Sequence, residues 1–306
     1  MRSRTAQPVD RTLADLASDV YMPNRSDPID GFVRLDRAEL ERAGIPPETL
    51  NDQSSGLTSA LYRDDAGRYV LAFAGTYRTS FRSWKTNIVQ GMGRPARQYV
   101  LAGRLGKLAR AAFGNDLVIT GHSLGGGLAT TAALKSGAPA VTFNPAGLSD
   151  QTIRGLRLDP AAAQEYAAAG NVRTYVVAGD PLTALQDARQ MHRVTIGGLA
   201  VGALGTSLGG VMGSAIGGLT GGAAGSATGK FVGASLGAAI VGAAGAAGTT
   251  GGLAQVRPAL GARIDLPDPL SAEGSGRMKR ALDLHQMSGV RRALDLTQPW
   301  SNQSGN

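Results

Sequence analysis

Several residue types are scarce in this chain of 306 residues, and each scarcity argues against a class of site. Cysteine is absent, which excludes disulfide bonds and thiolate metal sites, and only three histidines argue against a histidine-rich metal cluster. Aromatic residues make up 5%, and no RRM, KH, zinc-finger or helix-turn-helix pattern is present, so we expect no nucleic-acid partner. The basic first residues, MRSRTAQPVD, lack the apolar core of a secretory signal, so we expect synthesis in the cytoplasm without general export.

Positive charge is in excess over the whole chain. Lysine and arginine number 31 against 23 acidic residues, which gives a net charge of +8. This balance suits an anionic surface such as phospholipid headgroups, although a basic surface can also serve solubility alone.

Strand and helix patterns alternate through the first 180 residues, which predicts a single α/β domain. An amphipathic helix is expected over residues 10–21. The turn sequence DDAG predicts that the two strands flanking it are antiparallel. Strands are predicted at 57–63, 68–75, 117–121, 140–144 and 171–179. Helical stretches between the later strands indicate a sheet wound with crossover helices.

A tract of unusual composition runs from Thr195 to Val256. It contains no charged residue except Lys230, and glycine falls at every fourth position from Gly205 to Gly237. On a helix this spacing makes a glycine stripe that allows another backbone to approach closely. We interpret residues 195–256 as a glycine-zipper insert that forms a membrane-associating helical hairpin, with a glycine-packed soluble hairpin or oligomer as the alternative. One or two basic amphipathic helices are expected over residues 276–296.

The stretch LVITGHSLGGGLATTAAL places Ser123 between two glycines, directly after a β-branched apolar run. The pattern Gly-x-Ser-x-Gly recurs around Ser207 and Ser235, but these lie inside the glycine tract with no strand before them. A nucleophile elbow needs a strand, a tight turn whose glycines leave room for strained backbone, and a helix that follows at once. Ser123 is therefore the candidate nucleophile.

A serine nucleophile needs a base, and the base needs a carboxylate, in the chain order Ser, Asp or Glu, His. Asp180 follows the predicted strand TYVVAG and precedes Pro181, which stops that strand. Asp187 is the second candidate and Asp150 the third. An Asp before Pro can also form only a turn.

Three histidines compete for the role of the base. His122 adjoins the serine, so we expect it to pack or form hydrogen bonds beneath the turn. His192 satisfies the order but lies at the edge of the glycine tract without a clear strand before it. His285 follows the strand candidate ARIDL and a loop rich in Pro, Gly and Ser, where a triad histidine is expected, so we prefer it.

An oxyanion hole needs two backbone N–H groups near the nucleophile. One is expected from Leu124, the residue after Ser123. The segment AFAGTYRTSFRSW offers the other at Thr76, because Gly75 permits close approach. The alternative is that Gly75 and Thr76 form an ordinary turn after a strand.

These motifs together resemble the class 3 lipase family, the α/β-hydrolases related to fungal triacylglycerol lipases and bacterial phospholipases A1. VITGHSLGGGLAT resembles the elbow of that family, and FAGTYRTSFRSW resembles its oxyanion strand, in which a Gly-Thr pair is followed by a tryptophan, here Trp84. GDPL resembles the segment that carries the acid, and HQM at 285–287 resembles the terminal histidine motif. The resemblance runs from about Leu57 to Val290, interrupted by the glycine tract, and implies acyl-ester hydrolysis without a cofactor.

The chain departs from secreted fungal members, which carry signal peptides and disulfides and have no glycine-zipper insert. It looks more like a bacterial intracellular lipase or one exported by a specialised secretion system, such as a toxic phospholipase effector with an immunity or chaperone partner. We therefore expect an α/β-hydrolase catalytic domain built from residues 1–194 and 257–306. Its expected role is hydrolysis of lipid acyl esters at a membrane surface, with phospholipids as the preferred candidate substrates. The alternative is a membrane-perturbing or membrane-anchored protein that acts through the glycine tract and carries a degenerate hydrolase domain.

Overall fold

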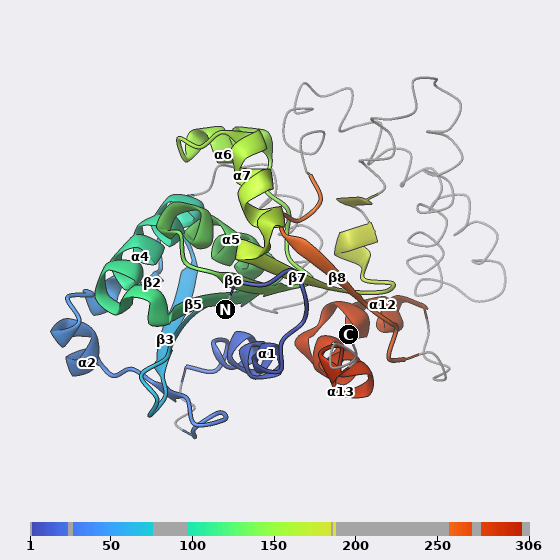
Figure 1. Cartoon of the computed structure of the whole chain (residues 1–306), viewed down its shortest axis with the longest axis horizontal. Coiled ribbons are helices and arrows are strands. Elements are labelled where there is room, and N and C mark those ends of the chain that lie inside the picture. Colours follow the sequence, from blue (N-terminus) through green and yellow to red (C-terminus); the bar gives the residue numbers. More distant parts are fainter. Residues whose placement is uncertain are drawn as a thin grey trace, which may run out of the picture.

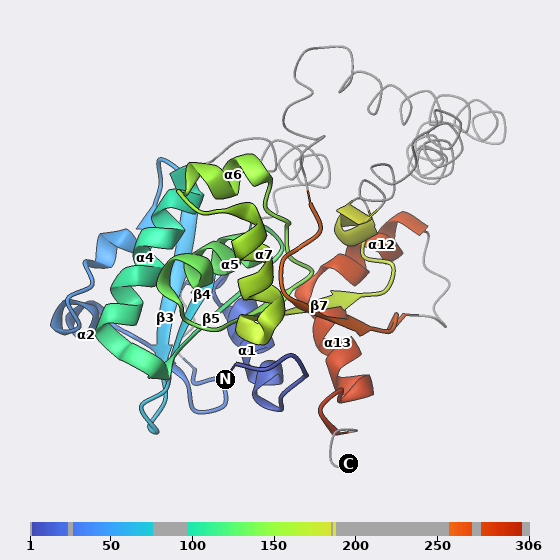
Figure 2. The same cartoon turned by 45° about the horizontal axis from the view of Figure 1, so that its top comes forward.

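The computed structural model describes residues 2–23, 27–75, 97–184, 186–187, 257–270 and 277–301. These residues form three layers, with one twisted sheet between two layers of helices (Figures 1 and 2). The α/β class predicted from the alternating patterns is therefore confirmed.

The sheet is mixed. Its first strands are antiparallel, and from β4 onward each strand runs parallel to its neighbour. Across the sheet the order is β1 (Val33–Arg34), β3 (Leu57–Arg63), β4 (Tyr69–Phe73), β5 (Leu117–His122), β6 (Ala140–Phe143), β7 (Val172–Val177) and β8 (Ala262–Leu266), and β2 (Asn51–Asp52) pairs with β3. Because β5, β6 and β7 are parallel neighbours, their carboxyl ends meet at one edge of the sheet.

Helices cover both faces of the sheet. One face carries α2 (Arg37–Arg42), α4 (Arg97–Phe113), α5 (Leu124–Ser136), α6 (Asp150–Gly155) and α7 (Pro160–Tyr166). The other carries α1 (Val9–Asp19), α12 (Arg277–His285) and α13 (Met287–Thr297). Short helical turns lie at Pro47–Thr49, Gly114–Asp116 and Ala167–Asn171. Among the described helices, none has both the length and the apolar character needed to cross a bilayer.

Each face of the sheet has its own apolar core, and alternate strand residues divide between them. Leu71 and Ile119 pack beneath α4 and α5, whereas Val70 and Val118 pack beneath α1 and α13. A sheet covered on both faces requires strands that are apolar throughout, and every residue of β5 is buried. This double burial explains why the central strands are nearly continuous apolar runs in the sequence.

The predicted elements match closely. The strands at 57–63 and 117–121 and the N-terminal helix are confirmed, and the basic segment after the tract forms two helices. The strand predicted over 140–144 ends at Phe143, because Asn144 turns out of it with φ 40°. The glycine tract at 195–256 lies outside the described residues, so the expected hairpin and the division into domains stay predictions.

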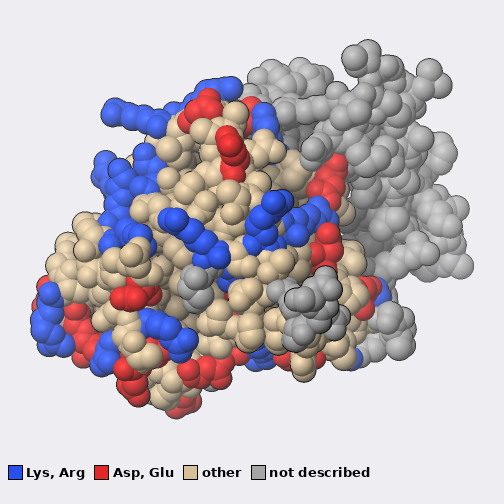
Figure 3. All heavy atoms as spheres, viewed as in Figure 1, with Lys and Arg blue, Asp and Glu red and all other residues tan. Residues whose placement is uncertain are grey.

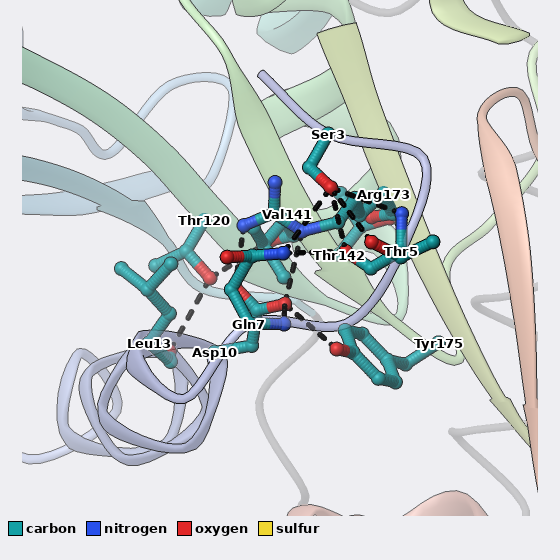
Figure 4. Close-up of polar contacts among 10 residues, drawn as sticks. All are labelled: Ser3, Thr5, Gln7, Asp10, Leu13, Thr120, Val141, Thr142, Arg173 and Tyr175. Carbon is teal, nitrogen blue, oxygen red and sulfur yellow. Dashed lines mark hydrogen bonds and ion pairs between the residues drawn. The ribbon is translucent and has the colours of Figure 1, made fainter. Parts of the chain in front are cut away.

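A buried polar group, here called the anchor cluster, fastens α1 to β7 and comprises Asp10, Arg173 and Tyr175 (Figure 4). Asp10 Oδ1 accepts from Arg173 Nη2 at 2.5 Å, and Asp10 Oδ2 accepts from Arg173 Nε at 2.9 Å and from the Tyr175 hydroxyl at 2.7 Å. Gln7 N–H also donates to this carboxylate, at 3.0 Å. Each side chain of the anchor cluster is at most 1% exposed, so these charges are compensated inside the protein and not by water.

Candidate active site

Ser123 lies on a sharp turn between β5 and α5. Its φ is 58° and its ψ is −126°, a conformation that costs a residue with a side chain on the order of 1 to 3 kcal/mol. A Cβ added to Gly121 would lie 2.2 Å from the carbonyl oxygen of Gly125, and one added to Gly125 would lie 2.2 Å from that of Phe73. Both glycines of the motif are therefore required by backbone contact, as the elbow hypothesis predicted.

Backbone hydrogen bonds hold this strained turn in place. Ser123 N–H donates to the carbonyl of Phe143 at 3.1 Å, and the Ser123 carbonyl accepts from Gly126 at 3.0 Å and from Ala146 at 2.9 Å. The turn is thus tied to the end of the neighbouring strand β6 as well as to the first turn of α5.

The structure brings Ser123, His285 and Asp180 together, and we call these three residues the elbow cluster. The distance from His285 Nε2 to Ser123 Oγ is 2.9 Å, and the distance from His285 Nδ1 to Asp180 Oδ1 is 2.6 Å. All three are buried: Ser123 is 6% exposed, His285 3% and Asp180 1%. A neutral imidazole in this position donates from Nδ1 to the carboxylate and leaves Nε2 free to accept the serine proton.

Asp180 is positioned by the end of β7. Its N–H donates to the carbonyl of Val177 at 3.0 Å, and its Oδ2 accepts from the N–H of Thr183 at 2.7 Å, as an N-cap residue does for the helical residues 181–184. Burial alone would raise the pKa of the Asp180 carboxyl, but attraction to His285 and the hydrogen bonds from His285 and Thr183 outweigh it. The net shift of the pKa is downward, so this carboxylate stays ionised at neutral pH.

His285 is the last residue of α12, which lies within the segment 276–296 that the sequence predicts to be helical. The helix fixes it because Leu284 is buried in the core that α1, α12 and α13 share beneath the sheet. Two side chains also hold the adjoining backbone carbonyls. Asn144 Nδ2 donates to the carbonyl of Leu284 at 3.0 Å, and His122 Nε2 lies 2.6 Å from the carbonyl oxygen of His285.

The contact made by His122 shows which ring nitrogen carries a hydrogen. A carbonyl oxygen can only accept, so His122 Nε2 carries the hydrogen. Burial, together with the nearby His285, lowers the pKa of His122 to about 3, which leaves the ring neutral at physiological pH. The prediction that His122 forms a hydrogen bond near the turn is confirmed, and its partner is the backbone of the candidate base.

Asn144 is a site residue that sequence reasoning missed. It follows β6 directly, its Oδ1 accepts from Val177 N–H at 2.9 Å, and its Nδ2 donates to the backbone next to His285. It thereby links β6, β7 and the end of α12. Its place as the last residue of a predicted strand, at the same sheet edge as Ser123, was the one signal available.

The oxyanion side of the site is described in part. Leu124 begins α5 directly after Ser123, where the first N–H groups of a helix have no partner within the helix. Thr76 lies outside the described residues. Gly75 N–H donates to the Tyr21 hydroxyl at 2.6 Å, and a Cβ added to Gly75 would lie 2.7 Å from that oxygen. Tyr21 therefore reaches from the end of α1 to the end of β4, a contact that the sequence did not predict.

The alternative acids have other partners. Asp187 Oδ2 lies 2.9 Å from Arg263 Nη1, and Asp150 Oδ1 lies 2.5 Å from Arg257 Nε. His192 and the serines of the two repeated motifs, Ser207 and Ser235, lie outside the described residues. Within the described part of the chain, no three His, Cys, Asp or Glu side chains come together as a metal site would need.

Comparison with known proteins places this chain in a family. The family model of the Tle-like phospholipase domain matches residues 12–271. Over 196 residues, 64% of its length, the chain is 46% identical to the extracellular phospholipase A1 of Serratia liquefaciens, and it spans 60% of that relative. A crystal structure of a mutant form of MDLA from Penicillium cyclopium is similar over 57% of this chain and 70% of that one, with 17% identity and a TM-score of 0.35. Because the family model matches far more than half of the chain, the protein belongs to the Tle-like phospholipase domain family.

Proposed function

We propose that the chain is a serine esterase that hydrolyses acyl esters of phospholipids, as a phospholipase A does. The observation that carries this proposal is the pair of contacts made by His285, 2.9 Å to Ser123 Oγ and 2.6 Å to Asp180 Oδ1, at a strained elbow. We also propose that the three-layer structure is an α/β-hydrolase fold, in which residues 195–256 are an insert between the acid and the histidine.

In the proposed reaction His285 takes the hydroxyl proton of Ser123 while Oγ attacks the ester carbonyl carbon. Asp180 keeps the imidazole oriented and stabilises the imidazolium that forms. The N–H groups of Leu124 and Thr76 would donate to the oxyanion. His285 then returns the proton to the leaving alcohol, and water, deprotonated by the same histidine, releases the fatty acid from the acyl-serine. These steps need no cofactor.

The choice of phospholipid as substrate rests on the family and on the name of the Serratia relative, a phospholipase A1. The net charge of +8 favours contact with an anionic lipid surface. That relative is described as extracellular, and we propose that this chain likewise acts outside the cell that makes it, at a membrane, as an effector with an immunity or chaperone partner.

Mass spectrometry of lipids tests the proposed activity. Phospholipid vesicles treated with the purified protein should yield free fatty acid and a lysophospholipid in equal amounts, and those treated with Ser123→Ala should yield neither. Release of a phosphorylated headgroup without fatty acid would contradict acyl-ester hydrolysis.

A second experiment tests the proposed membrane role of residues 195–256. Replacing the tract by a short Gly/Ser linker should be tolerable because the entropy of loop closure changes slowly with length. The shortened protein should keep turnover of a short soluble ester but lose most of its binding to anionic vesicles. Vesicle binding at the level of the full chain would contradict the membrane role.

A further inference from the structure

A surface pocket of about 430 Å³ lies far from the elbow cluster, between α4, α5 and the end of α6. Four of its lining residues are cationic and none is acidic. Figure 3 shows Lys and Arg side chains gathered over α4 and α6, at the upper left of the view. We call this hollow the basic pocket, after its cations Arg104, Lys107, Lys135 and Arg157.

The cations of the basic pocket have no acidic partner among the described residues. In the part of the chain that the structure describes, no carboxylate lies within ion-pair distance of any of the four. Elsewhere the chain pairs such groups, as Arg63 Nε does with Glu39 Oε1 at 2.8 Å. The pocket therefore concentrates positive charge that a ligand could neutralise.

One of these cations is fixed in place. Lys135 Nζ donates to the carbonyl of Leu156 at 2.8 Å, which holds the ammonium group at the pocket and leaves it further hydrogens to donate. Burial, together with the nearby charges of Lys107 and Arg157, lowers the pKa of Lys135.

We propose that the basic pocket binds a phosphate-bearing anion. Guanidinium groups match phosphate oxygens in bidentate pairs, and lysines add point charges, so two arginines and two lysines around one hollow suit this chemistry. Leu156 and Val100 add an apolar wall that can contact the rest of the ligand. The proposal goes beyond the ester hydrolysis proposed above and does not depend on it.

The bound anion is distinct from the phosphate of a lipid under attack at Ser123. Lys135 lies about 17 Å beyond Leu124 along α5, at about 1.5 Å of rise per residue. The phosphate and the acyl esters of one glycerophospholipid are only a few bonds apart, so the same molecule cannot occupy both places. The pocket must take either the headgroup of a second, anionic lipid or a soluble phosphate compound.

The test uses the double variant Lys107→Gln/Arg157→Gly. Arg157 has φ 58°, where glycine is favoured, so its replacement by glycine removes the charge without straining the backbone. Arg42→Gln is the matched control, because Arg42 is exposed on α2 and has no ion pair with a described carboxylate. All three forms are made in the full-length chain. If the double variant turns over a short soluble ester at the wild-type rate, it is folded. If no form shows turnover, urea unfolding curves of the variant and the wild type provide the same check.

Two arms distinguish the sources of the anion. Calorimetric titration with pyrophosphate at constant ionic strength tests a soluble ligand. Flotation with vesicles of phosphatidylglycerol in phosphatidylcholine, against pure phosphatidylcholine, tests a lipid headgroup, with every form carrying Ser123→Ala so that the lipids stay intact. We expect saturable binding in one arm, weakened about tenfold or more by the double variant and unchanged in the Arg42→Gln control.

Binding in the pyrophosphate arm would assign the pocket to a soluble phosphate, and binding in the vesicle arm alone would assign it to a headgroup. The proposal is overturned if neither arm shows binding or if the double variant binds as tightly as the wild type. It is also overturned if Arg42→Gln weakens binding as much as the double variant does. Binding of a single-stranded oligonucleotide through the pocket, without binding of pyrophosphate or vesicles, would overturn it as well.

Discussion

The elbow cluster and the anchor cluster are built from the same kinds of group. Each contains a buried aspartate carboxylate, a nitrogen-bearing side chain that donates to it, and a hydroxyl group. In the elbow cluster the hydroxyl of Ser123 contacts the histidine, and in the anchor cluster the hydroxyl of Tyr175 donates to the carboxylate itself. The contacts lie between 2.6 and 2.9 Å in the elbow cluster and between 2.5 and 2.9 Å in the anchor cluster. Burial and close contact are therefore common to both and do not separate a reactive site from a structural one.

The two clusters differ in whether a proton can move. An imidazole can accept and return a proton during a reaction, whereas a guanidinium is not deprotonated in proteins. Burial, together with the carboxylate of Asp10, raises the pKa of the Tyr175 hydroxyl, so that group keeps its proton. The anchor cluster thus lacks both a histidine base and a serine nucleophile.

The clusters also differ in their place on the sheet. Arg173 is the second residue of β7 and is covered by α1, whereas Ser123 and Asp180 follow the carboxyl ends of β5 and β7. Loops at that edge can present a side chain to a ligand, while the covered face of a strand cannot. We therefore expect changes in the elbow cluster to remove activity and changes in the anchor cluster to remove stability.

The largest expected effect is that of Ser123→Ala. Loss of the nucleophile should lower kcat on the order of a million-fold, while the free energy of unfolding stays close to that of the wild type. Ester turnover and urea unfolding measure the two quantities. Ser207→Ala and Ser235→Ala are the matched controls and should retain full activity; a control that is inactive while Ser123→Ala is active would refute the assignment.

Asp180→Asn should have the next largest effect. The amide cannot stabilise an imidazolium and favours the wrong tautomer of His285, so we expect kcat to fall on the order of ten-thousand-fold. Asp187→Asn, which alters a surface ion pair, should retain activity within about twofold because exposed pairs contribute little. If the two variants exchanged these effects, Asp187 would be the acid.

Asp10→Ala, in the anchor cluster, should lower stability and leave the catalytic rate of the folded protein unchanged. It removes the carboxylate that compensates the buried Arg173 guanidinium, which should lower the free energy of unfolding by about 3 to 5 kcal/mol. The fraction that remains folded should turn over ester at the wild-type rate. The double variant Asp10→Ala/Arg173→Met should recover most of the stability, and a failure to recover would mean that the buried charge is not the cause.

The smallest expected effect is the pH dependence of stability that His122 contributes, which His122→Gln tests. The folded-state pKa of about 3 lies below the ordinary value of about 6.5, so between these values the unfolded chain binds one proton more than the folded protein. The free energy of unfolding should therefore fall as pH falls, by about 2 kcal/mol from this group between pH 7.5 and pH 5. Glutamine keeps an N–H donor for the His285 carbonyl but does not titrate. Urea unfolding at both pH values should show a smaller loss in His122→Gln, and equal losses would contradict a neutral buried ring.

The sequence was sufficient for those parts of the site that depend on local pattern. Ser123 was found because an elbow requires a strand, two glycines and a helix in immediate succession. Asp180 was found because strand ends are visible where an apolar run meets Gly and Pro. The same logic located β5 and β7, which are rich in β-branched and apolar residues and are buried throughout.

The sequence was insufficient where a side chain depends on contacts across the fold. An arginine within the apolar run of β7 indicates a buried ion pair, but nothing local identifies Asp10 as its partner, 163 residues away. Asn144 and Tyr21 were missed for the same reason, because each makes its contact with a distant backbone group. The helices near the end of the chain were predicted from their amphipathic pattern, but the packing of α12 beneath the sheet, which places His285, depends on residues far away in the sequence.

Covalent labelling tests the central claim, that the elbow cluster is the reactive one, most directly. The full-length protein is treated with a fluorophosphonate, which reacts with activated serines, and the modified peptide is identified by mass spectrometry. We predict one adduct, on Ser123, that is lost in His285→Ala even though the serine is still present. An adduct on Ser207, Ser235 or another serine, with Ser123 unmodified in protein that turns over ester, would contradict the account.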